Sequence, residues 1–129
     1  MTVWTWLDAD IALAIHDRTL VLHGGAPGVR DEGLLQSALA RPQQLSFYGE
    51  TVDAVSLATA YTGGILQNHP FIDGNKRTGF ILGVLFLELH DLVFVASEED
   101  ATRAVLGLSA GELREAEYEV FLRRNIRKA

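Results

Sequence analysis

The chain contains no cysteine, which excludes disulfide bonds and a cysteine nucleophile and agrees with a reducing cytoplasm. It also contains no internal repeat, linker or low-complexity tract, and its first residues lack the basic stretch of a signal peptide. The very apolar run at residues 79–87 is followed by Glu88, His90 and Asp91, so it stays short of the roughly twenty apolar residues that a membrane span needs. We therefore expect one cytoplasmic domain over residues 1–129 that makes no contact with a membrane.

The net charge of −6 gives the chain no general basis for binding nucleic acid or an anionic membrane surface. Its cations are unevenly placed, however, and a cluster at Arg123, Arg124, Arg127 and Lys128 would suit RNA or an acidic partner. The alternative is that these cations complement the dipole of a helix that begins near Glu112. We favour this alternative and expect no direct contact with nucleic acid.

The hydrophobic residues make up 48% of the chain, which is enough for one domain with a substantial core, and their spacing predicts helices. A segment that is apolar on every side must be surrounded by other elements, so we expect a compact all-α bundle around a central buried helix at residues 76–90. The first helix should stop at Gly24 and Gly25, and the second before Pro42. Residues 92–96 should be extended. The expected helix starts are Asp8, Asp31, Val55, Ser97 with Asp100, and a capping box of Ser109 with Glu112.

Residues 69–80 join two of these helices and combine a base, a carboxylate, a turn and two cations. Pro70 should stop the preceding helix near Asn68, and Gly74 with Asn75 suits a tight turn. Lys76 and Arg77 then open the next helix, where the positive end of the macrodipole disfavours cations. A bound phosphate would resolve this conflict by accepting hydrogen bonds from backbone N–H groups and pairing with both side chains.

The other polar residues of this loop fit phosphate chemistry. Asp73 would oppose a bare phosphate but suits a divalent cation such as Mg²⁺ that bridges to phosphate oxygens. His69, with an ordinary pKa of about 6.5, is the natural acceptor for the proton of an attacking hydroxyl. Phe71 is expected to anchor the loop in the core. The alternative is an ordinary turn at residues 73–75 followed by two solvated cations.

The loop closely resembles the Fic-type motif, His-x-Phe-x-Asp/Glu-Gly-Asn-Gly-Arg-x-x-Arg. The matching residues are His69, Phe71, Asp73, Gly74, Asn75 and Arg77. Lys76 replaces the second glycine of the motif and Phe80 its final arginine, as in the Doc (death on curing) branch of the Fic/Doc superfamily. The resemblance extends from about residue 7 to residue 96 and includes Ile15-His16-Asp17, Gly24-Gly25, residues 27–35 and residues 37–42.

Membership in this branch implies the toxin of a type II toxin–antitoxin system. Many Fic proteins transfer the nucleotidyl part of ATP, whereas Doc-like members bind ATP in the opposite direction and act as protein kinases that use its γ-phosphate. The implied target is a Ser/Thr hydroxyl of elongation factor Tu, with inhibition of translation as the result. The implied inhibitor is a Phd-like antitoxin whose C-terminal segment folds against the toxin.

The resemblance also assigns roles to residues. It makes His69 the catalytic base and Asp73 the Mg²⁺ ligand, and it gives phosphate binding to Gly74, Asn75, Lys76 and Arg77. Residues 43–51, with Phe47, Tyr48 and Gly49, would form a flap that docks the target backbone by strand addition. The alternative for this segment is a plain surface loop.

Other functions stay open at this point. A nucleotidyl (AMP) transferase is allowed by residues 69–77 but opposed by Lys76 and Phe80. A noncatalytic binding module would lack His69 or Asp73, which this chain retains. The dipeptides His16-Asp17 and His90-Asp91 suggest a histidine/aspartate metal phosphohydrolase, but adjacent residues on one helix point in different directions. We expect His16 and His23 to be surface or capping residues.

Overall fold

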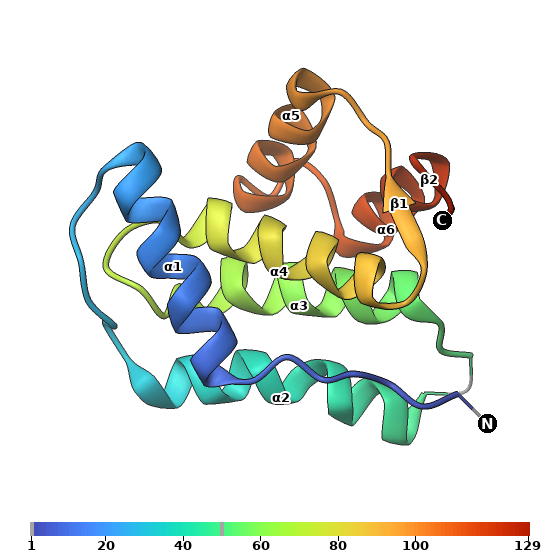
Figure 1. Ribbon diagram of the computed structural model, residues 1–129, viewed down its shortest axis with the longest axis horizontal. Coiled ribbons are helices and arrows are strands. Elements are labelled where there is room, and N and C mark those ends of the chain that lie inside the picture. The colour runs from blue at the N-terminus through green and yellow to red at the C-terminus, as the bar shows by residue number, and fades with distance from the viewer. Residues whose placement is uncertain (1, 50) are drawn as a thin grey trace.

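A computed structural model describes residues 2–49 and 51–129 as a bundle of helices with one small sheet (Figure 1). Helices α3 and α4 lie side by side in the middle of this bundle, with α2 against α3 and α1 across α4. The elements are α1 (Ala9–His23), α2 (Glu32–Tyr48), α3 (Ala54–Asn68), α4 (Asn75–Leu89), β1 (Leu92–Phe94), α5 (Glu98–Ser109), α6 (Glu115–Arg124) and β2 (Ile126–Lys128). The expected all-α bundle is confirmed.

Helix α3, not α4, is the most enclosed element. Every residue from 57 to 65 is buried, whereas α4 leaves Ile81 38% and Leu89 46% exposed. The expectation that residues 76–90 form the buried centre is therefore only half right, because one side of α4 faces solvent. The threonines and glycines of α3 are small enough to let α2, α4 and α6 pack around it. Because these residues are not strongly apolar, the sequence did not indicate that α3 is the central helix.

The expected helix starts are confirmed where a side chain caps them. Asp8, Asp31 and Ser97 each accept a hydrogen bond from a backbone N–H group in the first turn of α1, α2 and α5. Helix α3 starts at Ala54, one residue before the expected Val55, and Asp53 is its cap. Helix α1 stops at Gly24, whose φ of 76° favours glycine. Helix α3 stops before Pro70, as its sequence predicts.

Helix α2 does not end before Pro42, and that prediction is wrong. Pro42 lies inside the helix and is buried together with Leu35, Ala38 and Leu39, a spacing that places all four on one face. Packing of this face outweighs the hydrogen bond that proline cannot donate. Residues 43–48 of the predicted flap are thus helical, with Phe47 and Tyr48 exposed in the last turn and Gly49 as the cap; Glu50 lies outside the described residues.

The C-terminal part differs from its prediction in two ways. Ser109 ends α5 rather than starting a helix with Glu112, and the first turn of α6 instead pairs the Arg114 N–H group with the Glu117 carboxylate at 2.9 Å. Residues 126–128 form β2, which pairs with β1 in an antiparallel sheet. Arg127 and Lys128 therefore do not cap a helix. In the part of the chain that the structure describes, no helix is long and apolar enough to cross a membrane.

The contact between α3 and α4 predicts a steric effect at Gly83. A Cβ atom there would overlap the Thr62 hydroxyl and lie 3.1 Å from the Ala58 carbonyl oxygen. We expect Gly83→Ala to lower the free energy of unfolding by about 1–3 kcal/mol, measured by urea denaturation. Gly33→Ala, on the exposed first turn of α2, is the matched control: its Cβ would lie 3.3 Å from the Asp31 side chain, and it should change this free energy by less than about 1 kcal/mol. Equal stability of the two variants would contradict this packing.

An ion pair between Arg123 and Asp53 joins α6 to the start of α3, with an N···O distance of 2.7 Å. The hydrogen bond from Arg123 holds the pKa of Asp53 below its ordinary value of 3.8. A depressed carboxyl pKa stabilises the fold above the pKa of the unfolded chain, and this stability is lost as the pH falls through the folded pKa.

We therefore expect Arg123→Gln to lower the free energy of unfolding at pH 7 by at most about 1 kcal/mol, since both partners are largely exposed. The difference from the wild type should shrink between about pH 4 and pH 2. Urea denaturation across this range measures it. Arg124→Gln removes the same charge without removing this pair, so a matching pH dependence in Arg124→Gln would refute the assignment.

Candidate active site

The loop between α3 and α4, residues 69–74, is fastened to the segment that precedes α2. The Pro70 carbonyl oxygen accepts hydrogen bonds from the N–H groups of Arg30 at 2.7 Å and Asp31 at 3.1 Å. Val29 and Phe71 form an isolated antiparallel bridge. The Arg30 side chain adds two more bonds, from Nε to the His69 carbonyl oxygen at 2.8 Å and from Nη2 to that of Asn68 at 2.9 Å.

Phe71 anchors this loop in the core, as expected. Its side chain is fully buried and stacks on the ring of His16 at a centroid distance of 3.9 Å. His16 is itself buried, so the prediction that it lies on the surface or caps a helix is wrong. Its Nε2 lies 2.7 Å from the Asp73 carbonyl oxygen, and because a carbonyl can only accept, this nitrogen carries the proton. His16 thus supports the loop at two points, Phe71 and Asp73.

Asn75 supports the loop from inside. It is buried, its side-chain carbonyl oxygen accepts from the Phe71 N–H group at 3.0 Å, and its amide nitrogen donates to the Phe71 carbonyl oxygen at 2.9 Å. The Asn75 side chain is therefore engaged with the backbone. Its predicted share in phosphate binding rests on its own backbone N–H group in the first turn of α4.

The Asp73 side chain is exposed at the mouth of the loop. Its carboxylate accepts hydrogen bonds from the N–H groups of Gly74 at 2.8 Å and Ala26 at 3.3 Å. These bonds, with smaller contributions from Arg77 and Lys76, lower the pKa of Asp73 below its ordinary value, so the group is ionised at neutral pH. An exposed carboxylate with acceptor capacity to spare fits a hard divalent cation.

Helix α4 begins without a side-chain cap from any described residue, because its N-cap is Gly74, with φ 80°. The first N–H group with an acceptor inside the helix is that of Thr78, which donates to the Gly74 carbonyl oxygen at 3.0 Å. The N–H groups of residues 75–77 thus stay available, and the Lys76 and Arg77 side chains beside them are exposed. This helix end can bind an anion such as a phosphate.

A groove of about 880 Å³ brings these groups together, and it has two chemically different parts. Its polar part contains His69, Asp73, Gly74, Lys76 and Arg77. Its apolar part is formed by Phe80 and Ile81 of α4, Phe94 of β1, and Ala101, Val105 and Leu106 of α5. The rings of Phe80 and Phe94 pack edge to face with their centroids 5.6 Å apart, so the Phe80 ring is held in the wall of the groove.

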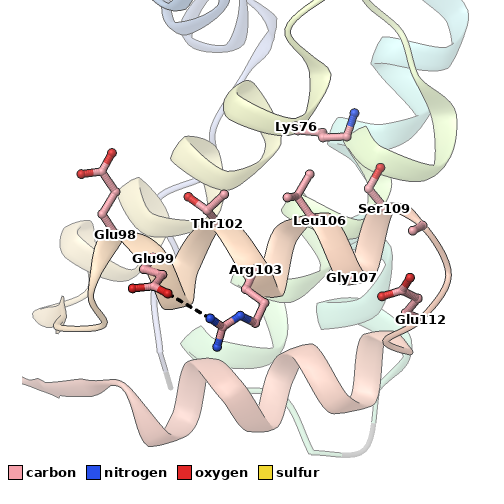
Figure 2. A pocket seen from close by; sticks show the side chains of 10 residues that line it. Lys76, Glu98, Glu99, Thr102, Arg103, Leu106, Gly107, Ser109 and Glu112 are labelled. Carbon is pink, nitrogen blue, oxygen red and sulfur yellow. Dashed lines mark hydrogen bonds and ion pairs between the residues drawn. The ribbon is translucent and has the colours of Figure 1, made fainter.

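Helix α5 forms the wall opposite α4. Figure 2 shows Glu98, Thr102 and Leu106 along the side of α5 that faces Lys76, whereas Arg103 pairs with Glu99 on a different side of the helix. Glu98, Thr102 and Leu106 line both this surface and the groove with His69. Glu98 thus contributes an anionic side chain to the wall of the groove, at the N-terminal end of α5.

The structure brings the predicted residues His69, Asp73, Gly74, Asn75, Lys76 and Arg77 into one groove, and leaves Phe47, Tyr48 and Gly49 outside the residues that line it. Sequence reasoning missed Arg30, His16 and Ala26, which hold the loop. The segments of His16 and Arg30 were singled out only as family-like and Ala26 was not singled out, and no local pattern reveals which loop these residues contact.

The suggested histidine/aspartate metal site does not form within the described residues, where no group of three or more His, Cys, Asp or Glu side chains is placed to hold a metal ion. His90 has partners of its own instead, since its Nε2 accepts from the Thr5 N–H group at 3.0 Å.

Comparison with known proteins agrees with this geometry. The family model described as "Fic/DOC family" matches residues 6–87, which include the whole loop. The chain is 31% identical over 112 residues to "Protein kinase doc" of Escherichia phage P1, covering 87% of this chain and 88% of that protein. It is 40% identical over 88 residues to "Toxin Doc" of Mycolicibacterium smegmatis, and this match covers 65% of each protein. The chain therefore belongs to the Fic/DOC family and resembles its Doc members.

Proposed function

We propose that this protein is a Doc-like toxin that transfers the γ-phosphate of ATP to a serine or threonine hydroxyl of another protein. The observation that carries the proposal is the meeting, in one groove, of His69, the Asp73 carboxylate and the uncapped, cationic start of α4. The names of the two relatives, a protein kinase and a toxin, support it.

In the proposed reaction, a ring nitrogen of His69 accepts the proton of the target hydroxyl as its oxygen attacks the γ-phosphorus in line. The new oxygen–phosphorus bond forms while the bond from the γ-phosphorus to the bridging oxygen breaks, and ADP leaves with that oxygen. The N–H groups of residues 75–77 and the side chains of Lys76 and Arg77 bind phosphate oxygens and offset the developing charge.

Asp73 would hold a magnesium ion together with the phosphates. Its ionised, exposed carboxylate suits Mg²⁺, which usually binds one or two protein carboxylates and completes its shell with phosphate oxygens and water. The ion would neutralise charge on the phosphates. Asp73 itself stays fixed through the hydrogen bonds from Gly74 and Ala26.

Lys76 and Phe80 favour transfer of the γ-phosphate over transfer of AMP. The groove is lined by the cations Lys76 and Arg77, but at Phe80, where the Fic motif has its final arginine, it presents an aromatic ring next to other apolar side chains from α4, β1 and α5. An apolar surface suits the nucleoside better than distal phosphates, which need cations. ATP would therefore bind with its terminal phosphate next to His69. AMP transfer is the second candidate, because the residues shared with the Fic motif allow it.

The resemblance to Doc further suggests a translation factor of the elongation factor Tu type as the target, in the cytoplasm, and a Phd-like antitoxin as the inhibitor. Phe47 and Tyr48 remain candidates for docking the target, since their side chains are 81% and 79% exposed. They would do so as aromatic contacts at the end of α2, because these residues are helical and offer no strand edge.

The proposed chemistry predicts which label moves from ATP to the target. With elongation factor Tu as substrate, we expect incorporation from γ-labelled ATP and none from α-labelled ATP. His69→Ala should lower the rate by about 10²- to 10⁴-fold through loss of the base, and Asp73→Ala should lower it through loss of the Mg²⁺ ligand. Asp17→Ala, at an exposed position of α1, is the control. Full activity in both site variants would overturn the mechanism, and α-label transfer would establish the AMP transferase.

The role of the helix start predicts a selective effect on ATP affinity. Loss of a charge-assisted hydrogen bond costs about 1.5–3 kcal/mol, so Arg77→Gln should raise the KM for ATP by about 10- to 100-fold. Arg103→Gln removes a cation from the outer side of α5 and should leave this KM unchanged. Steady-state kinetics at saturating target protein measure both values. An unchanged KM in Arg77→Gln would remove Arg77 from the phosphate site.

A further inference from the structure

The backbone at His69 is unusual for a residue with a side chain. His69 caps α3 with φ 51° and ψ 54°, in the left-handed region that costs a non-glycine residue about 1–2 kcal/mol. Within the described residues, His69 and Asp91 are the non-glycine residues with positive φ. Such a conformation persists only where surrounding contacts impose it.

Hydrogen bonds fix both peptide groups of His69. On the N-terminal side, its N–H group continues the helix by donating to the Ile65 carbonyl oxygen at 2.9 Å. On the C-terminal side, its carbonyl oxygen accepts from Arg30 Nε at 2.8 Å, while Arg30 Nη2 binds the preceding carbonyl oxygen, that of Asn68, at 2.9 Å. One planar guanidinium thus sets the orientation of two successive carbonyl groups.

We propose that Arg30 is a positioning residue for the reaction at His69: its guanidinium holds the end of α3 in the left-handed turn that directs the His69 ring into the groove. This inference rests on the proposed function, because it assigns Arg30 to the same chemistry. Arg30 does not belong to the motif loop and acts on His69 only through its backbone.

The contribution of the Arg30 side chain can be tested apart from the backbone hydrogen bonds that join residues 28–31 to residues 70–72. The backbone N–H groups of Arg30 and Asp31 bind the Pro70 carbonyl oxygen, and the Ile72 N–H group donates to the Gly28 carbonyl oxygen at 3.1 Å. These bonds do not depend on the residue type at position 30. A substitution of Arg30 should therefore keep the loop in place and release mainly the carbonyl groups of Asn68 and His69.

An arginine is required by this geometry and a lysine does not replace it. The guanidinium presents several N–H donors in one rigid plane, whereas an ammonium is a point charge on a flexible stem. If the positive charge alone mattered, Arg30→Lys would be fully active. Loss of activity in both Arg30→Lys and Arg30→Ala is the result expected for two-point support of the backbone.

We would measure phosphate transfer to elongation factor Tu by Arg30→Ala and Arg30→Lys. A displacement of about 1 Å can cost about 10²-fold in rate, so we expect kcat to fall 10- to 100-fold in both while the KM for ATP changes less than about twofold. Millimolar guanidinium chloride should restore part of the kcat of Arg30→Ala, and sodium chloride should not. Arg41→Ala, which breaks an ion pair with Glu115 on α6, is the control for general destabilisation and should keep kcat.

A second measurement does not require activity. The ring resonances of His69 in an NMR spectrum, assigned by their absence in His69→Ala, should shift in Arg30→Ala and return toward their original positions with guanidinium. Unshifted resonances, a fully active Arg30→Lys, or a loss confined to KM would each overturn the inference. If the wild-type protein transfers no phosphate, the proposed function fails, and the His69 resonances still decide whether Arg30 positions the ring.

Discussion

The close contact between α3 and α4 determines where the reactive loop lies. Small residues make this contact possible: Gly79 and Gly83 of α4 lie against the backbone and side chain of Thr62, whose hydroxyl donates to the Gly79 carbonyl oxygen at 2.8 Å. Because the two helices lie this close and are joined by residues 69–74 alone, the C-terminal end of α3 is held beside the N-terminal end of α4. The fold therefore places His69, at the end of α3, next to the uncapped start of α4.

The polar backbone groups of the two helix ends at this junction, the end of α3 and the start of α4, have different partners. The carbonyl groups at the end of α3 are bound by Arg30, so the negative end of that helix is neutralised by the protein itself. The N–H groups at the start of α4 have Gly74 in place of a capping side chain and stand beside Lys76 and Arg77. The junction therefore presents an uncapped helix start with two cationic side chains, in a protein whose net charge is −6. A polyanion such as ATP is the ligand that this local imbalance favours.

The sequence predicted best what depends on neighbouring residues. Asp8, Asp31 and Ser97 were recognised as helix starts, and Pro70 as a stop, because capping and proline effects act within one turn. Pro42 was misjudged because the packing of α2 on the core outweighs the local preference of proline, and the sequence alone does not give the energy of that packing. For the same reason the flap was expected to be extended although residues 43–48 are helical.

The candidate site was predictable in its motif but not in its surroundings. The residue types and spacing from His69 to Arg77 are themselves typical of a phosphate site, and the groove contains these expected residues. His16 was expected at the surface because nothing in its neighbours along the chain shows that Phe71 will stack on it. The wall made by α5 was missed as well. The sequence of α5 is that of an ordinary amphipathic helix, and Lys76, which it faces, lies thirty residues before Leu106 in the chain.

The pairing of β1 with β2 has a consequence for the order of events during synthesis. Phe94 lies in the wall of the groove and belongs to β1, and its pairing partner is Ile126. The loop that carries His69 is followed by some fifty more residues before this partner is made. A nascent chain can thus form the hairpin of α3 and α4 early, because its contacts are local. The groove acquires its full wall only after residues 126–128 have left the ribosome, so a partly synthesised chain would still lack the β1–β2 pairing that holds Phe94 in this wall.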